Sequence, residues 1–329
     1  MRETATGEAP SARPRSAGPD QLKALLLVLV VFGHTYMVPL DSDLLRYMIY
    51  GFHMPAFLFL SGYLVSEASL RRRSLGELLR HYWRRMLLAW LVVSLVWRAA
   101  ATPGASWAPK DLVDAVVLQP AFHLWYIPAL MLAVVVAWVL VRTARPGLWI
   151  GAVAALAYLG TPALESITGP LPFDRRYLLY FVYFAFGLMV RNGWARVLPV
   201  PWALASVAGG LVLRAAVFAG AESIDQLAWL VLNIGAMSLV PPAIGWLERP
   251  LPAIGPSLAT IGQYSLWVYL LHPFVTSGKV MPGAEIWGSS VPLSLAVTVL
   301  VLVVAVVLIA VGTRLRERIG GRPVGGAAF

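Results

Sequence analysis

Long apolar runs recur along almost the whole sequence. Each holds about 17 to 23 residues, the length that an α-helix rising about 1.5 Å per residue needs to cross a hydrocarbon layer roughly 30 Å thick. The composition agrees, since 59% of the 329 residues are hydrophobic and only 13% are charged. Soluble domains are much less apolar and carry about twice as much charge. The sequence therefore predicts an all-α integral membrane protein.

Ten segments fit this pattern and predict a bundle of about ten transmembrane helices within one membrane domain, residues 20–313. They are residues 21–38, 44–65, 84–101, 122–142, 148–164, 177–190, 202–220, 226–246, 261–279 and 291–313. Residues 1–19 lack apolar periodicity and predict a disordered tail, and residues 314–329 predict a second, basic tail. The first run lacks a small-residue cleavage signature, so we expect a retained helix rather than a signal peptide.

Basic residues outnumber acidic ones by 26 to 16. In a soluble protein this surplus would suggest nucleic acid as a partner, but here most of the positive charge falls in alternate short loops. If the N-terminus is cytoplasmic, every Lys and Arg lies on the inner side except Arg46, Arg98, Lys110, Arg175, Arg176, Arg214 and Lys279. Because Lys and Arg are enriched at the cytoplasmic ends of membrane helices, both tails are predicted to be cytoplasmic. The protein is predicted to lie in the inner (plasma) membrane. Its partner is then the lipid bilayer and not nucleic acid.

Several kinds of chemistry are absent from the sequence. It contains no Cys, which excludes disulfides and thiolate metal sites. It also lacks a Gly-rich phosphate loop, an HExxH metal pair and a GxSxG elbow. We therefore expect neither a metal enzyme nor a nucleotide-hydrolysing enzyme.

Ionisable residues within apolar segments are costly in lipid, which makes them candidates for a functional site. His34 lies in the first segment, eleven residues after Lys23. That spacing puts both on one helix face, within about 20° and roughly 16 Å apart along the axis. Asp20 lies near the same stripe and is placed to pair with Lys23. His34 could act as a general base that takes a proton from an acceptor hydroxyl, or as a packing residue whose ring forms a hydrogen bond to a neighbouring helix.

Two further histidines stand beside prolines in predicted spans, His53 near Pro55 and His272 before Pro273. Proline frees a backbone carbonyl and bends a helix. Each histidine therefore either satisfies a freed carbonyl or belongs to the site.

Two other segments carry weaker signals. His123 and Trp125 open the segment 122–142, at an end where aromatic residues commonly form an interfacial belt. Ser61 and Gly62 are more typical of close helix packing than of nucleophilic catalysis.

A dense basic cluster precedes the third segment. One interpretation is that the cluster sets the orientation of the protein in the membrane and attracts anionic lipid. The other is that its guanidinium groups bind the phosphates of coenzyme A. The cluster consists of Arg71, Arg72, Arg73, Arg80, Arg84 and Arg85.

These motifs together resemble the acyltransferase 3 family, most closely its fucose 4-O-acetylase-like branch. In that family a basic residue, ten others and a His mark the first helix, and Lys23 to His34 fits, with Lys where Arg is commoner. Residues 52–63, the pair Arg84 and Arg85, residues 124–126 and residues 261–272 match later motifs in the same order.

The resemblance implies an O-acyltransferase that moves an acyl group, most simply acetyl, from cytoplasmic acyl-CoA to a hydroxyl of a sugar, glycan or glycosylated metabolite. No permanently bound cofactor is implied. His34 and Lys23 would be catalytic, and the substrate site would include Arg84, Arg85, His53, Ser61, His123, Trp125 and His272. Larger members add a hydrolase-like domain, which we expect to be absent here or provided by a partner.

Two other classes of protein fit part of the pattern. A transporter or flippase of a glycan or small molecule also carries intramembrane His and broken helices. A regulatory protein that has kept the fold without the chemistry would be expected to lose costly residues such as Lys23 and His34.

Reporter fusions test the predicted orientation. A reporter at Arg73 or after Arg322 should be cytoplasmic, and one at Asp41 or Lys110 should be external, because basic residues hold the inner helix ends. An external reporter at Arg73 would overturn a donor site built on the arginine cluster.

Overall fold

The computed structural model describes residues 16–221, 224–249 and 253–318, and all regular elements in these ranges are helices. The all-α prediction is therefore confirmed for the described residues. Most of the two predicted tails lies outside them, although α1 already begins at Gly18 and the last helix continues to Arg318.

The first half of the chain forms α1 (Gly18–Thr35), α2 (Leu44–Tyr50), α3 (His53–Tyr63), α4 (Glu67–Arg72), α5 (Leu75–Tyr82), the π-helical turn η1 (Trp83–Leu87), α6 (Leu88–Ala101), α7 (Pro109–Val113), the π-helical turn η2 (Asp114–Leu118), α8 (Tyr126–Leu140) and α9 (Pro146–Thr168). The second half forms α10 (Arg176–Leu179), α11 (Phe181–Arg191), α12 (Val200–Phe218), α13 (Asp225–Ser238), α14 (Val240–Leu247), α15 (Gly255–Gln263), α16 (Ser265–Leu271), α17 (Pro273–Thr276), α18 (Ala284–Trp287) and α19 (Val291–Arg318).

Four helical stretches in the described residues are long and apolar enough to cross a membrane. They are α9, α12, the combined α13 and α14, and the part of α19 from Val291 to Gly312. These helices confirm the segments predicted at 148–164, 202–220, 226–246 and 291–313. The predicted segment 21–38 also forms one helix, α1, although its polar residues lower its mean hydropathy.

Some predicted segments are interrupted by short breaks. Residues 44–65 divide into α2 and α3, and the break falls at Gly51 and Phe52 rather than at Pro55. Pro55 lies in the first turn of α3, where a missing backbone N–H removes no helical hydrogen bond. Pro273 likewise begins α17, so the segment predicted at 261–279 becomes three helices starting at Gly255.

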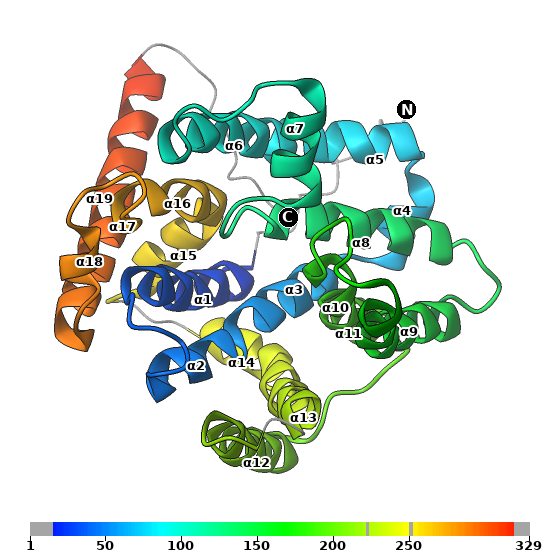
Figure 1. The fold of residues 1–329 in the computed structure, drawn as a ribbon. Helices are drawn as coiled ribbons and strands as arrows, with labels where there is room; N and C mark the ends of the chain where they lie inside the picture. Colours follow the sequence, from blue (N-terminus) through cyan, green and yellow to red (C-terminus); the bar gives the residue numbers. More distant parts are fainter. Residues whose placement is uncertain (1–15, 222–223, 250–252, 319–329) are drawn as a thin grey trace, which may run out of the picture.

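Helix α1 lies at the centre of the fold. It packs against α3, α14, α15, α16 and α19, and Figure 1 shows α15 and α16 on one side of it and α3 on the other. The paired α12 and α13 lie at one edge of the bundle and α19 at another. Because other helices surround α1, its polar residues are enclosed by protein. Polar residues in such a place need hydrogen-bond or ion-pair partners on the neighbouring helices or on α1 itself.

Two contacts between helices depend on glycine. A Cβ on Gly62 of α3 would lie 2.0 Å from the carbonyl oxygen of Phe184, and a Cβ on Gly187 of α11 would lie 2.0 Å from that of Phe59. A Cβ on Gly262 of α15 would lie 1.7 Å from the carbonyl oxygen of Asp20. The packing role predicted for Gly62 is therefore confirmed, since only glycine lets these backbones approach so closely.

Gly62→Ala should destabilise the protein because α3 and α11 would have to separate. We expect a loss of about 1 to 3 kcal/mol, as is typical of overpacking, measured as a lower midpoint of thermal unfolding in detergent. Gly209→Ala is the matched control, since a Cβ there meets no heavy atom within 4 Å. Equal midpoints for the two variants would contradict the close-packing explanation.

Candidate active site

One end of α1 carries a buried ion pair. The Lys23 Nζ atom lies 3.3 Å from Oδ1 of Asp20, and the two residues are only 5% and 2% exposed. The pairing predicted from their spacing is therefore confirmed. A buried charge is stable only with partners, so the loss of either residue would remove a close opposite charge from the other.

Lys23 also lines a narrow pocket between α1, α3, α8 and α16. Its polar wall includes Ser61, Tyr126 and Tyr269, and the cavity volume is about 30 Å³. The Ser61 and Tyr126 hydroxyls lie 2.8 Å apart and share a hydrogen bond. The pocket is therefore narrow in this structure.

Three histidines from distant parts of the chain meet beyond Tyr269. The ring centroid of His272 lies 5.3 Å from those of both His34 and His123, and the latter two are 6.0 Å apart. Phe122 packs on His34, with ring centroids 4.7 Å apart, and Trp97 packs on both Phe122 and His123. The structure thus brings together three of the histidines that the sequence singled out, in a largely apolar enclosure.

Tyr269 links the histidine cluster to the pocket. Its side chain lines the pocket, and its ring centroid lies 5.1 Å from that of His123. Its hydroxyl also donates a hydrogen bond to the backbone carbonyl of His123. The route from Lys23 to the histidines therefore runs past Tyr269.

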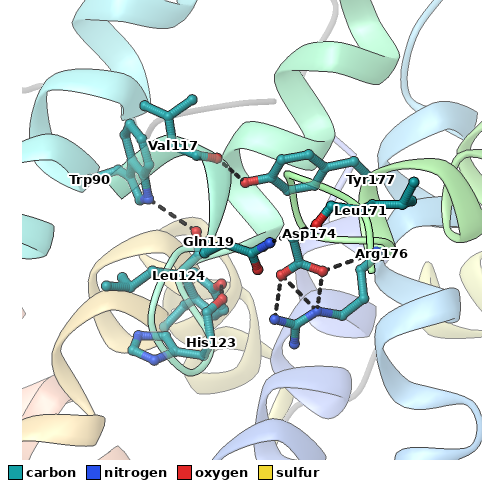
Figure 2. A network of polar contacts seen from close by, with 10 residues as sticks. Trp90, Val117, Gln119, His123, Leu124, Leu171, Asp174, Arg176 and Tyr177 are labelled. Carbon is teal, nitrogen blue, oxygen red and sulfur yellow. Dashed lines mark hydrogen bonds and ion pairs between the residues drawn. The ribbon is translucent and has the colours of Figure 1, made fainter. Parts of the chain in front are cut away.

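His123 is held by the turn that precedes α8. Phe122 has a φ of 56°, the only left-handed backbone among the non-glycine residues that the structure describes. Such strain costs about 1 to 3 kcal/mol and persists only where surrounding contacts maintain it. Here Trp90 supports the turn by donating its indole N–H to the carbonyl of Leu124 at 3.0 Å, as Figure 2 shows.

A second set of contacts joins this turn to the segment before α10 (Figure 2). The Asp174 carboxylate accepts bonds from the backbone and guanidinium of Arg176, and the Gln119 amide donates to the carbonyl of Leu171. The Tyr177 hydroxyl donates to the carbonyl of Val117. The turn that carries His123 is therefore fixed at both ends.

The aromatic residues at the start of α8 do not form an interfacial belt. His123 is 2% exposed and Trp125 is 4% exposed, and the helix itself begins only at Tyr126. Trp125 packs on Tyr180 and under the Arg176 guanidinium, 4.6 Å from its ring centroid. Trp125 does not line the pocket beside Lys23, whereas His123 belongs to the histidine cluster.

His53 and His272 both satisfy backbone carbonyls. Nδ1 of His53 lies 2.7 Å from the carbonyl oxygen of Ile49, and Nδ1 of His272 lies 3.0 Å from that of Val268. His272 in addition lies within the histidine cluster, whereas His53 reaches the ring of Tyr50, at 5.1 Å between centroids. His272 thus bonds the Val268 carbonyl, which also accepts the backbone N–H of His272, and it lies in the histidine cluster. Its part in the site stays a prediction.

Arg84 and Arg85 lie in the π-helical turn η1, between α5 and α6. Arg84 is exposed, and Nη1 of Arg85 lies 3.4 Å from Nε2 of His81. Burial lowers the pKa of His81, and the charges of Arg85 and Arg73 lower it further, which favours a neutral ring able to accept this bond. Neither Arg84 nor Arg85 lines the pocket beside Lys23.

Sequence reasoning did not identify Tyr50, Phe122 or Trp97 as parts of the site. These side chains are uncharged at neutral pH, so a search for costly ionisable groups passes over them. Tyr50 nevertheless lies close to His53 and, as shown below, contacts His34.

The fold and the site together define a helical protein suited to a membrane, with buried histidines and a buried Lys–Asp pair. The chain belongs to the acyltransferase 3 family, since the family profile described as "Acyltransferase domain" matches residues 16–311. The family assigned from the sequence motifs is therefore confirmed.

One curated relative is the nodulation protein NolL of Mesorhizobium japonicum. The two proteins are 30% identical over 188 residues, which covers 53% of this chain and 48% of NolL. The match thus spans about half of the relative's length. No solved structure matches the chain.

Proposed function

We propose that the protein is a membrane O-acyltransferase that moves an acyl group, most simply acetyl, from cytoplasmic acyl-CoA to a hydroxyl of a sugar, glycan or glycosylated metabolite. The observation that supports it best is the meeting of His34, His123 and His272 beyond a pocket that begins at Lys23. A transfer between two substrates needs a base at the acceptor and a separate approach for the donor. The two ends of α1 are suited to these two tasks.

The proposal includes the topology of the membrane domain. Ten spans, in the inner (plasma) membrane, would be formed by α1, α2 with α3, η1 with α6, α8, α9, α10 with α11, α12, α13 with α14, α15 to α17, and α19. Both termini are then cytoplasmic, which agrees with the uneven distribution of Lys and Arg. In this orientation Lys23 lies towards the cytoplasm and His34 towards the outer half.

In the proposed reaction His34 is the general base. Its imidazole takes the proton of the acceptor hydroxyl as that oxygen attacks the thioester carbonyl carbon. The new C–O bond forms, the C–S bond breaks, and the leaving thiolate receives the proton back from the imidazolium. The products are the acyl ester and free coenzyme A, so every proton is accounted for.

Lys23 is proposed to act at the donor end of the pocket. It is held by Asp20 and lines the pocket at the inner end of α1, where its positive charge can attract polar groups of the donor. Arg84 and Arg85 are proposed to hold the donor's phosphates outside the pocket. His53, Ser61, His123, Trp125 and His272 remain proposed parts of the substrate site.

An assay with labelled acetyl-CoA tests the function as a whole. Purified protein in lipid vesicles should transfer label to a sugar acceptor and release free thiol in equal amounts. Movement of the sugar across the vesicle membrane without transfer of label would instead establish a transporter or flippase.

Arg84→Lys and Arg85→Lys test the donor site. Lys keeps the charge but loses the planar guanidinium that matches phosphate, so a phosphate site should show a raised KM for acyl-CoA with kcat little changed. Arg145→Lys, at the start of α9, is a control outside the cluster. An unchanged donor KM in both variants would leave the cluster with orientation and lipid binding as its role.

His34→Ala and His34→Gln test the base. Loss of a positioned general base typically lowers the rate by about a hundred-fold to ten-thousand-fold, whereas loss of one interhelical hydrogen bond costs about 0.6 to 2 kcal/mol. Turnover, normalised to the amount recovered as a monodisperse peak in detergent, should therefore collapse while recovery holds. Near-normal turnover would refute the base assignment, and poor recovery would favour a packing role.

A further inference from the structure

We propose that Tyr50 positions His34 for catalysis by holding the imidazole in the tautomer that carries its proton on Nδ1. The other ring nitrogen, Nε2, is then the atom that accepts the proton of the substrate. This inference rests on the proposed function of His34 as the general base, and it adds a residue that contacts the base rather than the substrate.

Tyr50 is the last residue of α2, directly before the break at Gly51 and Phe52. Its hydroxyl lies 3.2 Å from Nδ1 of His34 and 3.1 Å from the carbonyl oxygen of Gly33. The rings of Tyr50 and His34 meet edge to face, with centroids 5.9 Å apart. One phenol oxygen thus meets both the ring and the backbone at the end of α1.

The carbonyl of Gly33 requires a donor from outside its helix. A carbonyl near the end of a helix loses its usual partner, which would here be the backbone N–H of Met37. That N–H instead donates to the carbonyl of Gly288, at 3.0 Å. Tyr50 therefore supplies the hydrogen bond that this part of the backbone needs.

Counting protons then sets the direction of every bond at the phenol. A phenol has one proton, and a carbonyl oxygen can only accept, so the proton of Tyr50 goes to Gly33. A guanidinium can only donate, and Nη2 of Arg46 lies 3.5 Å from the same phenol oxygen. The contact with His34 must therefore be donated by the imidazole, which places the proton on Nδ1.

The consequence is a defined base. With Nδ1 protonated in the neutral ring, the lone pair is on Nε2, and no described residue forms a hydrogen bond to that atom. The hydrogen bond to Tyr50 also restrains rotation of the ring, so that Nε2 keeps one direction. A histidine without this restraint would spend part of its time in the other tautomer, with Nε2 unable to accept a proton.

Counting protons in the same way predicts the tautomers of two other histidines, which serve as references in the same measurement. Nδ1 of His53 and Nδ1 of His272 both lie at hydrogen-bond distance from carbonyl oxygens, so both are expected to carry their protons on Nδ1. The chain contains five histidines, so a spectrum of protein labelled with ¹⁵N only in histidine is simple enough to assign. The signal that disappears in His34→Gln identifies His34.

Tyr50→Phe is the test variant, because it removes only the hydroxyl. Tyr47→Phe is the matched control one turn earlier on α2. The ring of Tyr47 packs on Phe218 and against Arg214, and its hydroxyl makes no hydrogen bond within the described part of the chain. Both variants remove one phenol oxygen from the same short helix, and only one of them touches His34.

The measurement is the ¹⁵N spectrum of the neutral histidines in lipid nanodiscs, together with kcat and KM. Wild type and Tyr47→Phe should show His34 protonated on Nδ1. Tyr50→Phe should shift the ring towards the Nε2–H form and lower kcat by about tenfold or more, with the donor KM unchanged, because the base is present in the wrong tautomer for much of the time.

Each other outcome decides against the inference. An Nε2–H form in the wild-type spectrum would overturn it without any variant, even if Tyr50→Phe were not recovered. A Tyr50→Phe protein that keeps the Nδ1–H form, or that changes tautomer without losing turnover, would also overturn it. Failure of the proposed function gives a different result, since full activity of His34→Gln would remove the base role whatever the tautomer of His34.

Discussion

The exclusion of unpaired polar groups from a water-poor interior is the constraint on which this structure depends. Helix α1 is enclosed by its neighbours yet carries an ion pair at one end and a histidine at the other. Asp20 compensates Lys23, and Tyr50 serves both His34 and the end of the helix backbone. At these positions of α1 the protein supplies partners that lipid lacks.

The broken helices follow from the same constraint. At two of the breaks a histidine ring adds a hydrogen bond to the carbonyl four residues earlier, which also accepts a backbone N–H. Broken helices let side chains enter the centre of a bundle at angles that a continuous helix does not permit. The break before α17 places His272 beside His34, and the break before α3 places Tyr50 against the end of α1. The same irregularities that disrupt the spans thus build the site.

The proposed acyl transfer would account for the arrangement in chemical terms. Acyl transfer joins two substrates, and the proposed orientation lets them approach from opposite sides of the membrane to the two ends of one helix. The pocket between those ends is small as it stands, with a free volume of about 30 Å³. Ser61 and Tyr126 line this pocket, on the path that the proposed reaction gives to the donor arm.

The sequence by itself determined the features that depend on local spacing. The lengths of the apolar runs predicted the helical class and four helices long and apolar enough to cross a membrane, and the short separation along α1 predicted the Asp20–Lys23 pair. Only the tertiary structure decided that His123 and His272 lie beside His34, that Phe122 adopts a left-handed backbone, and that the break precedes His53. These features depend on how distant helices pack, including the close backbone contacts that only Gly62 and Gly262 permit. The periodicity within one segment carries no information about which other helix that segment will contact.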